Sequence, residues 1–234
     1  MKPRGVLLAF LGAALVGIFI SFGLGGLMLG DATPSASTVS ALVFAVLAAF
    51  AGAALAQSYP HSRLGFCNTV TLLRLSLASV LVGACVAGGW SAWPAFAVAS
   101  TAFALDGLDG FLARREELSS EFGAQFDMEV DSILALTLAA LAFQSGAAGA
   151  YVLLLGLPRY LFGSAQLVFP WLKGDLPARF SRKVVCVIQI AALLLMVLPL
   201  VGSPLTDWIA GFAAFALIWS FWRDIVWLKQ ATRA

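Results

Sequence analysis

The chain has 234 residues, of which 61% are hydrophobic and only 11% are charged. A soluble domain carries about 25% charged residues, so this composition excludes an ordinary soluble protein and indicates a polytopic membrane protein. The formal net charge is only +2, which gives no support for a nucleic-acid partner.

Eight apolar segments are long enough to cross a bilayer, which takes roughly 17–25 residues in a helix. The first segment is longer than the apolar region of a secretory signal peptide, so we expect it to be retained. The expected fold is therefore all-α and polytopic. In chain order, the expected spans lie near residues 6–29, 39–57, 70–88, 93–113, 124–144, 149–171, 184–202 and 205–228.

Basic residues occur at both ends of the chain and in alternate loops. Arg63, Arg114 and Lys173 lie in such loops, whereas the loops around 30–38 and 145–148 contain neither Lys nor Arg. The positive-inside rule therefore predicts that both termini and every basic loop are cytoplasmic. We expect an integral protein of a membrane, the inner membrane if the source is a bacterium, whose site faces the cytoplasm.

Four aspartates lie at the predicted cytoplasmic ends of the fourth and fifth spans: Asp106, Asp109, Asp127 and Asp131. An acid at the centre of a membrane helix costs about 2.5–3.5 kcal/mol, so four of them need compensation. At about 100° per residue, each pair shares one face of its helix with small residues. Carboxylates without a His or Cys partner favour Mg²⁺, Mn²⁺ or Ca²⁺, as in a two-metal phosphoryl-transfer site. The alternative is that single acids end helices or pair with nearby arginines.

The segment around these acids reads D-x2-D-G-x2-A-R-x8-G-x3-D-x3-D. It resembles the signature of the CDP-alcohol phosphotransferase (CDP-alcohol phosphatidyltransferase) family at every fixed position. The resemblance covers about residues 66–228 and implies a six-helix membrane core. The first two spans lie outside it, so we expect a two-helix transmembrane hairpin over residues 1–60 and the family domain over 61–234.

The resemblance also implies roles for the signature residues. It implies that Asp106, Asp109, Asp127 and Asp131 bind metal, two Mg²⁺ or Mn²⁺ ions, and that Asp131 is the catalytic base for the acceptor hydroxyl. The small residues would line the nucleotide pocket, and the arginine would contact the donor phosphates. The residues implied for donor binding are Gly110, Ala113, Arg114 and Gly123.

Polar residues outside the signature extend this expected site. Asn68 and Thr71, in the pattern N-x2-T-x2-R at the start of the third span, are candidate nucleotide contacts, although both are also ordinary helix-start residues. Arg159 lies halfway along an expected span, where an unpaired guanidinium is costly. We expect it to bind an anionic acceptor, together with Arg179, Arg182 and Lys183, although the ordinary positive-inside bias would also explain those three residues.

Within this family the chain is similar to phosphatidylglycerophosphate synthases, which implies CDP-diacylglycerol as the donor and glycerol 3-phosphate as the small polar acceptor. Met128, Ser132 and Tyr160 depart from the residues usual in those enzymes. Phosphatidylinositol-phosphate synthesis, or another acceptor, therefore stays open as the alternative.

Two further interpretations remain at this point. A cation transporter would also carry intramembrane acids, but internal repeats and discontinuous helices are typical of that class. The sequence indicates neither, and its acids lie at the cytoplasmic edge instead of the midplane. Small residues four apart, as at Ala9, Ala13 and Gly17, permit close helix packing within the chain or between copies. A homodimer is thus an open alternative.

Overall fold

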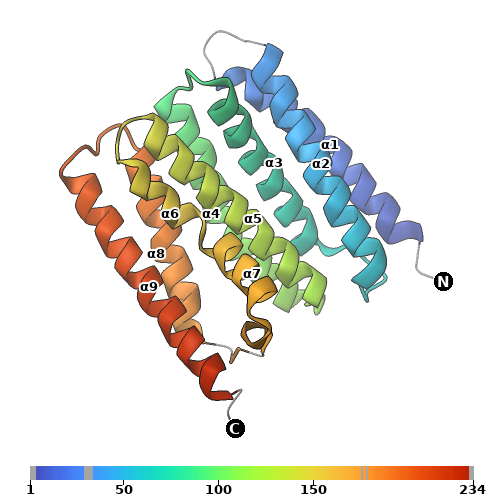
Figure 1. The fold of residues 1–234 in the computed structure, drawn as a ribbon. Coiled ribbons are helices and arrows are strands. Elements are labelled where there is room, and N and C mark those ends of the chain that lie inside the picture. Colours follow the sequence, from blue (N-terminus) through green and yellow to red (C-terminus); the bar gives the residue numbers. More distant parts are fainter. Residues whose placement is uncertain (1–3, 29–33, 175, 178, 232–234) are drawn as a thin grey trace. The chain divides into compact units, whose positions relative to one another are not determined.

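The computed structural model of the chain describes residues 4–28, 34–174, 176–177 and 179–231, without the side chains of Arg4, Pro34, Ser35 and Asp109. The described residues form helices and no strand (Figure 1). The α-helices and 3-10 helices are, in chain order, α1 (Arg4–Leu27), α2 (Pro34–Ser58), α3 (Gly65–Ala87), α4 (Ala92–Arg115), α5 (Glu121–Gln144), η1 (Ala150–Val152), α6 (Leu153–Gly156), α7 (Pro158–Val168), η2 (Pro170–Lys173), α8 (Phe180–Val197) and α9 (Leu205–Ala231).

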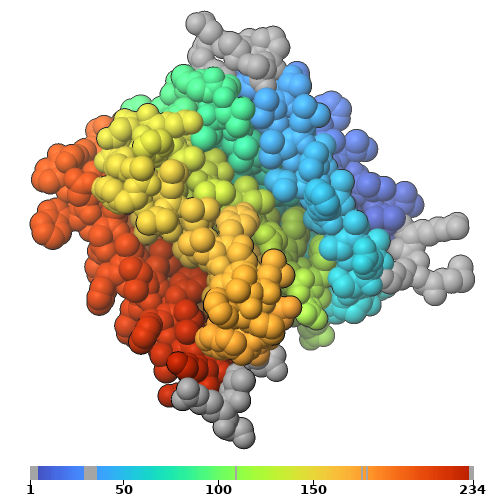
Figure 2. Space-filling view, in the orientation of Figure 1, coloured from blue at the N-terminus to red at the C-terminus, as the bar shows by residue number. Residues whose placement is uncertain are grey.

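The chain divides by its internal contacts into two compact units, residues 1–137 and 138–234. In the first unit, α1 packs on α2 and α3, and α3 packs also on α2 and α4. The side chains of α1 and α2, in blue and cyan, lie against one another in the space-filling view (Figure 2). Small residues allow this close packing, since a Cβ on Gly17 would overlap the ring of Phe44.

One apolar core joins the N-terminal hairpin to the helices that carry the signature. Phe10 and Phe44 belong to it from the hairpin, and Leu72, Phe126 and Val130 belong to it from α3 and α5. Phe126 and Val130 each directly precede an aspartate of the signature. Because successive helical residues are about 100° apart, burying these two residues turns the aspartates toward a neighbouring face.

Among the described residues, six helices are long and apolar enough to cross a membrane, namely α1, α2, α3, α4, α8 and α9. Their outward faces carry large apolar side chains, such as Phe19, Phe50 and Trp208, of which 76%, 72% and 76% of the surface is exposed. Such surface is stable in lipid and not in water. These helices support the prediction of an all-α integral membrane protein.

The fifth and sixth expected spans differ from the other six. The fifth forms a continuous helix, α5. Because Asp127, Glu129 and Asp131 lower its apolar character, α5 is not one of the helices that are apolar enough to cross a membrane. The segment expected to form a span near 149–171 is not one continuous helix. The segment bends by 67° between Ala150–Gly156 and Pro158–Val168, because proline lacks an N–H and disfavours a helical residue before it.

The second unit is built on the pair α8 and α9, and α6 and η2 pack against α9. Gln189 on α8 is buried, and its Nε2 donates a hydrogen bond to the carbonyl of Leu155 on α6, at 2.5 Å. This bond holds the helix before the bend to α8.

The expected division of the chain at residue 60 stays a prediction, since α1 and α2 share the first unit with α3.

Candidate active site

The centre of the candidate site is a buried arginine, Arg74, ten residues into α3. Its side chain has 0% exposure, and its Nε donates to the carbonyl of Ala102 on α4 at 3.2 Å. Its Nη2 lies 2.9 Å from Oδ1 of Asp106, and its two terminal nitrogens also pair with Asp127 and Asp131. One side chain of α3 therefore holds three carboxylates from two other helices.

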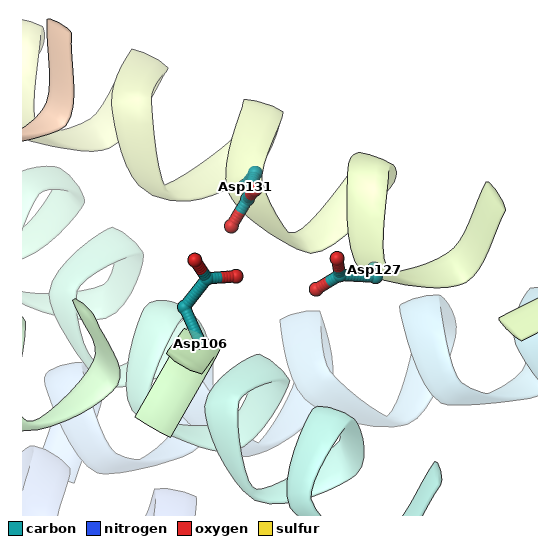
Figure 3. Close-up of side chains that lie close together, drawn as sticks. All are labelled: Asp106, Asp127 and Asp131. Atoms are coloured by element: carbon teal, nitrogen blue, oxygen red, sulfur yellow. The ribbon is translucent and has the colours of Figure 1, made fainter. Parts of the chain in front are cut away.

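The three acids come from α4 and α5, and their carboxylates point toward one another (Figure 3). Asp127 and Asp131 are four residues apart, so they share one face of α5, and Asp106 faces them from α4. One oxygen from each lies within 4.8 Å of the others, and all three residues are partly buried. The structure thus brings together three of the four predicted metal ligands.

The chemistry of this cluster fits a divalent cation. Three ionised carboxylates carry three negative charges, and Arg74 supplies one positive charge, so a deficit of two remains. Each carboxylate offers two oxygens and about four acceptor positions, and hard oxygen donors are the ligands of Mg²⁺ and Mn²⁺. Asp109 lies on α4, one turn after Asp106, and its side chain is outside the described residues.

The predicted nucleotide residues occupy α3, α4 and the start of α5. Thr71 and Asn68 are buried on α3, about one and two turns before Arg74 respectively. A Cβ on Gly123 of α5 would lie 3.5 Å from Oδ1 of Asn68, so the two residues face one another. The hydroxyl of Thr71 donates to the carbonyl of Cys67 at 3.1 Å, which is a bond within α3.

The remaining residues that were predicted to bind the nucleotide-linked donor lie on the last two turns of α4. Gly110 and Ala113 are half-buried, and Arg114 is exposed. A Cβ on Gly110 would lie 3.6 Å from Nη1 of Arg114, so this guanidinium extends along the small-residue face of its helix. That is the arrangement in which a ligand could approach the backbone and meet a planar cation.

A loop residue that sequence reasoning did not single out ties these helices together. Glu116, after α4, accepts hydrogen bonds from the backbone N–H groups of Phe66 at 3.1 Å and Cys67 at 3.4 Å. These groups belong to the first turn of α3, which has unpaired N–H donors and a positive dipole end. The carboxylate of Glu116 therefore links the α4–α5 loop to the helix that carries Arg74.

The predicted acceptor residues lie in the second unit. Nη1 of Arg179 and Nε of Arg182 lie 3.7 Å and 3.5 Å from the carboxylate of Asp224 on α9, a residue that is buried. The guanidinium of Arg179 also stacks over the ring of Trp227, 5.3 Å from its centre. Two cations converge on one acid here, so the cluster keeps an excess of positive charge.

The other two predicted acceptor residues lie on separate elements. Arg159, expected halfway along a span, is half-buried in the first turn of α7, directly after the bend. Lys183 is exposed on α8. The structure brings Arg179 and Arg182 together at Asp224, and it leaves the shared role of all four basic residues a prediction.

Sequence reasoning missed two charged residues that organise these clusters. Arg74 is the last residue of the pattern N-x2-T-x2-R, and an arginine deep in an apolar helix needs a partner such as a carboxylate. Asp224 was given no role, although it is an acid within an expected span and two loop arginines were already suspected of binding anions. In both cases the signal was a charge in an apolar helix.

Comparison with known protein families agrees with this geometry. The model of the CDP-alcohol phosphatidyltransferase family matches residues 64–222, which is more than half of the chain and includes Arg74 and the acid cluster. Comparisons with curated proteins and with solved structures gave no significant match. The chain therefore belongs to the CDP-alcohol phosphatidyltransferase family, whose activity is phosphatidyl transfer from a CDP-alcohol to an acceptor.

Proposed function

We propose that this chain transfers the phosphatidyl group of CDP-diacylglycerol to glycerol 3-phosphate and releases CMP. The observation that carries the proposal is the convergence of Asp106, Asp127 and Asp131, from two helices, within 4.8 Å of one another. Membership of the family supports the reaction type. The apolar helices around the cluster suit a donor that is anchored in lipid.

The reaction joins the acceptor oxygen to the phosphorus that carries the diacylglycerol. The bond that breaks joins this phosphorus to the oxygen bridging to CMP, which leaves with that oxygen. Divalent ions, when bound, would neutralise charge on the diphosphate. Asp106, Asp109 and Asp127 are proposed to hold two such ions, Mg²⁺ or Mn²⁺, and Asp131 is proposed both to bind metal and to accept the proton of the acceptor hydroxyl.

The residues around the acids are proposed to bind the donor. Asn68 faces Gly123, so a nucleotide could contact a buried amide beside a backbone that carries no side chain, and Thr71, buried one turn after Asn68, is proposed as a further contact. Arg114 offers a fork of N–H donors that matches a phosphate. It extends beside Gly110, whose lack of a side chain leaves room for the diphosphate.

An anionic acceptor is supported by the basic cluster of the second unit. Arg179 and Arg182 share one carboxylate, that of Asp224, and Nη2 of the neighbouring Arg223 donates to the hydroxyl of Ser181 at 2.6 Å. Two guanidinium groups beside one acid leave an excess of positive charge, which attracts a phosphate. We include Arg159 and Lys183 in the acceptor set on the same charge argument. Inositol phosphate carries the same phosphate chemistry, so it is the second candidate acceptor.

The test is a reconstitution of the full chain in detergent or nanodiscs with radiolabelled CDP-diacylglycerol and Mg²⁺ or Mn²⁺. The acceptor panel contains glycerol 3-phosphate, inositol phosphate, inositol and serine. We expect CMP release with glycerol 3-phosphate and a phosphorylated lipid product. Release with inositol phosphate alone would select the second candidate, and no release with any acceptor would contradict the proposal.

A further inference from the structure

The two N-terminal helices lie ahead of the residues that the family model matches, which begin at residue 64. Tyr59, the residue directly after α2, is buried at 7% exposure and belongs to the core shared by the hairpin, α3 and α5. Its ring meets the ring of Phe122 edge to face, with centroids 5.6 Å apart. This tyrosine is therefore fixed between the hairpin and the start of α5.

The hydroxyl of Tyr59 has a defined direction. It lies 2.8 Å from the carbonyl oxygen of Arg63 and 3.1 Å from that of Leu64, and it donates its proton to this pair. Burial raises the pKa of Tyr59 to about 12, so the proton stays on the hydroxyl at physiological pH. A hydroxyl that donates in one direction accepts in another, and here the acceptor side faces Asn68.

Nδ2 of Asn68 donates to the hydroxyl of Tyr59 at 3.1 Å and to the carbonyl of Leu64 at 2.6 Å. Both donor positions of the amide nitrogen are thus directed toward the loop after the hairpin. The amide oxygen is left on the opposite side, where a Cβ on Gly123 would lie 3.5 Å away. Gly123 is one turn before Asp127 on α5, so this oxygen lies beside the helix face that carries Asp127.

We infer that Tyr59 is a positioning residue, which holds the carbonyl oxygen of Asn68 toward the nucleotide of the donor. An amide oxygen in this orientation accepts a hydrogen bond, so its partner must be an N–H or O–H group, such as the amino group of the base or a ribose hydroxyl. The inference rests on the proposed function, because it takes Asn68 as a nucleotide contact. It gives the added hairpin a role in donor binding.

The substitution Tyr59→Phe removes the hydroxyl and keeps the ring in the core. We expect the affinity for CMP, measured with the full chain in detergent and Mg²⁺, to fall about three- to tenfold, the range of one neutral hydrogen bond. The KM for the donor should rise by the same factor, while the acceptor KM and the affinity for Mn²⁺ stay unchanged. A purely structural lesion would alter all of these together.

Two comparisons make the test specific. Tyr151→Phe is the matched control, because Tyr151 also donates a hydrogen bond, to Asp207 in the second unit, and should leave CMP affinity unchanged. Asn68→Ala should weaken CMP binding, and the double variant Tyr59→Phe/Asn68→Ala should be no weaker than Asn68→Ala alone. Additive losses would overturn the inference.

Equal CMP affinity in wild-type protein and Tyr59→Phe would also overturn it, while wild-type turnover would leave the proposed function intact. A wild-type chain that binds no CMP and releases none from CDP-diacylglycerol would instead overturn the proposed function, and this role of Tyr59 with it. Thermal unfolding of each variant, compared with wild type, shows whether the fold is retained.

Discussion

Nη2 of Arg74 lies 2.9 Å from Oδ1 of Asp106, so a side chain of α3 holds a carboxylate that α4 presents. The same guanidinium pairs with Asp127 and Asp131 on α5. Carboxylates that converge in an apolar protein repel one another and lose hydration. Arg74 offsets both effects, and its planar fork also sets the directions from which the acids approach.

Replacing Arg74 tests this arrangement directly. We expect Arg74→Ala to lower CMP release at least about 100-fold and to destabilise the protein by about 3–5 kcal/mol, because buried charges lose their partner. Arg74→Lys should recover part of the stability, since an ammonium keeps the charge and lacks the fork. Turnover assays and thermal unfolding in metal-free buffer measure the two effects.

Arg63→Ala is the control for Arg74→Ala, because Arg63 is an exposed arginine in the loop before α3. It should change neither stability nor turnover by more than about twofold. Near-normal turnover in Arg74→Ala would show that the acids assemble without it.

Removing one carboxylate charge from α5 should abolish the reaction. We expect Asp127→Asn and Asp131→Asn each to lower CMP release at least about 1,000-fold, because the proposed metal site loses a ligand and, with Asp131, the proton acceptor. The variants should still insert into the membrane. Radiolabelled CMP release from matched amounts of membrane protein is the measurement.

Glu129→Gln provides the isosteric comparison on the same helix, since Glu129 is exposed and lies outside the three-acid cluster. Its activity should stay within about twofold of wild type. Full activity of either aspartate variant would refute the assignment of these acids.

Chelation should separate the protein from its proposed ions. We expect EDTA to stop CMP release and added Mg²⁺ or Mn²⁺ to restore it. Mn²⁺ should also raise the unfolding temperature of the wild-type protein, because a ligand that binds only the folded state stabilises it. The rise should be absent in Asp127→Asn. Activity that survives exhaustive chelation would argue against metal dependence.

The basic residues proposed to bind the acceptor predict a change in the KM for the acceptor alone. We expect Arg182→Ala and Arg159→Ala each to raise the KM for glycerol 3-phosphate about tenfold, as the loss of one charged hydrogen bond implies, with the donor KM unchanged. Steady-state kinetics with each substrate varied in turn give both values. Lys229→Ala, at the exposed end of α9, is the control, and an unchanged acceptor KM in Arg159→Ala would remove that residue from the set.

The contact between Glu116 and α3 predicts a loss of stability. Glu116→Ala should cost about 1 kcal/mol, because two N–H groups at the start of α3 lose their acceptor. Glu117→Ala is the neighbouring control, because the side chain of Glu117 is exposed. The backbone φ of 55° at this position applies to the glutamate and to the alanine alike. Thermal unfolding of the two variants should differ, and equal midpoints would contradict the role of Glu116.

Much of the fold could be read from the sequence, because the signals were local. Long apolar runs indicate membrane helices wherever they occur, and the spacing of Asp106, Asp127 and Asp131 places each acid on a helix face by geometry alone. The signature that joins these residues led to the family that the comparison shows. The proline at position 158 is also a local signal, for a break in the helix, but the hydrophobicity of the whole segment favoured a single span.

The tertiary structure alone decided which charges meet. Arg74 and Asp131 are 57 residues apart in the chain, and Arg182 and Asp224 are 42 apart, so no local pattern could pair them. The orientation of the Asn68 amide likewise depends on a tyrosine from the loop after α2. Helical periodicity determines which face of a helix a residue occupies, whereas the packing of neighbouring helices determines what that face contacts.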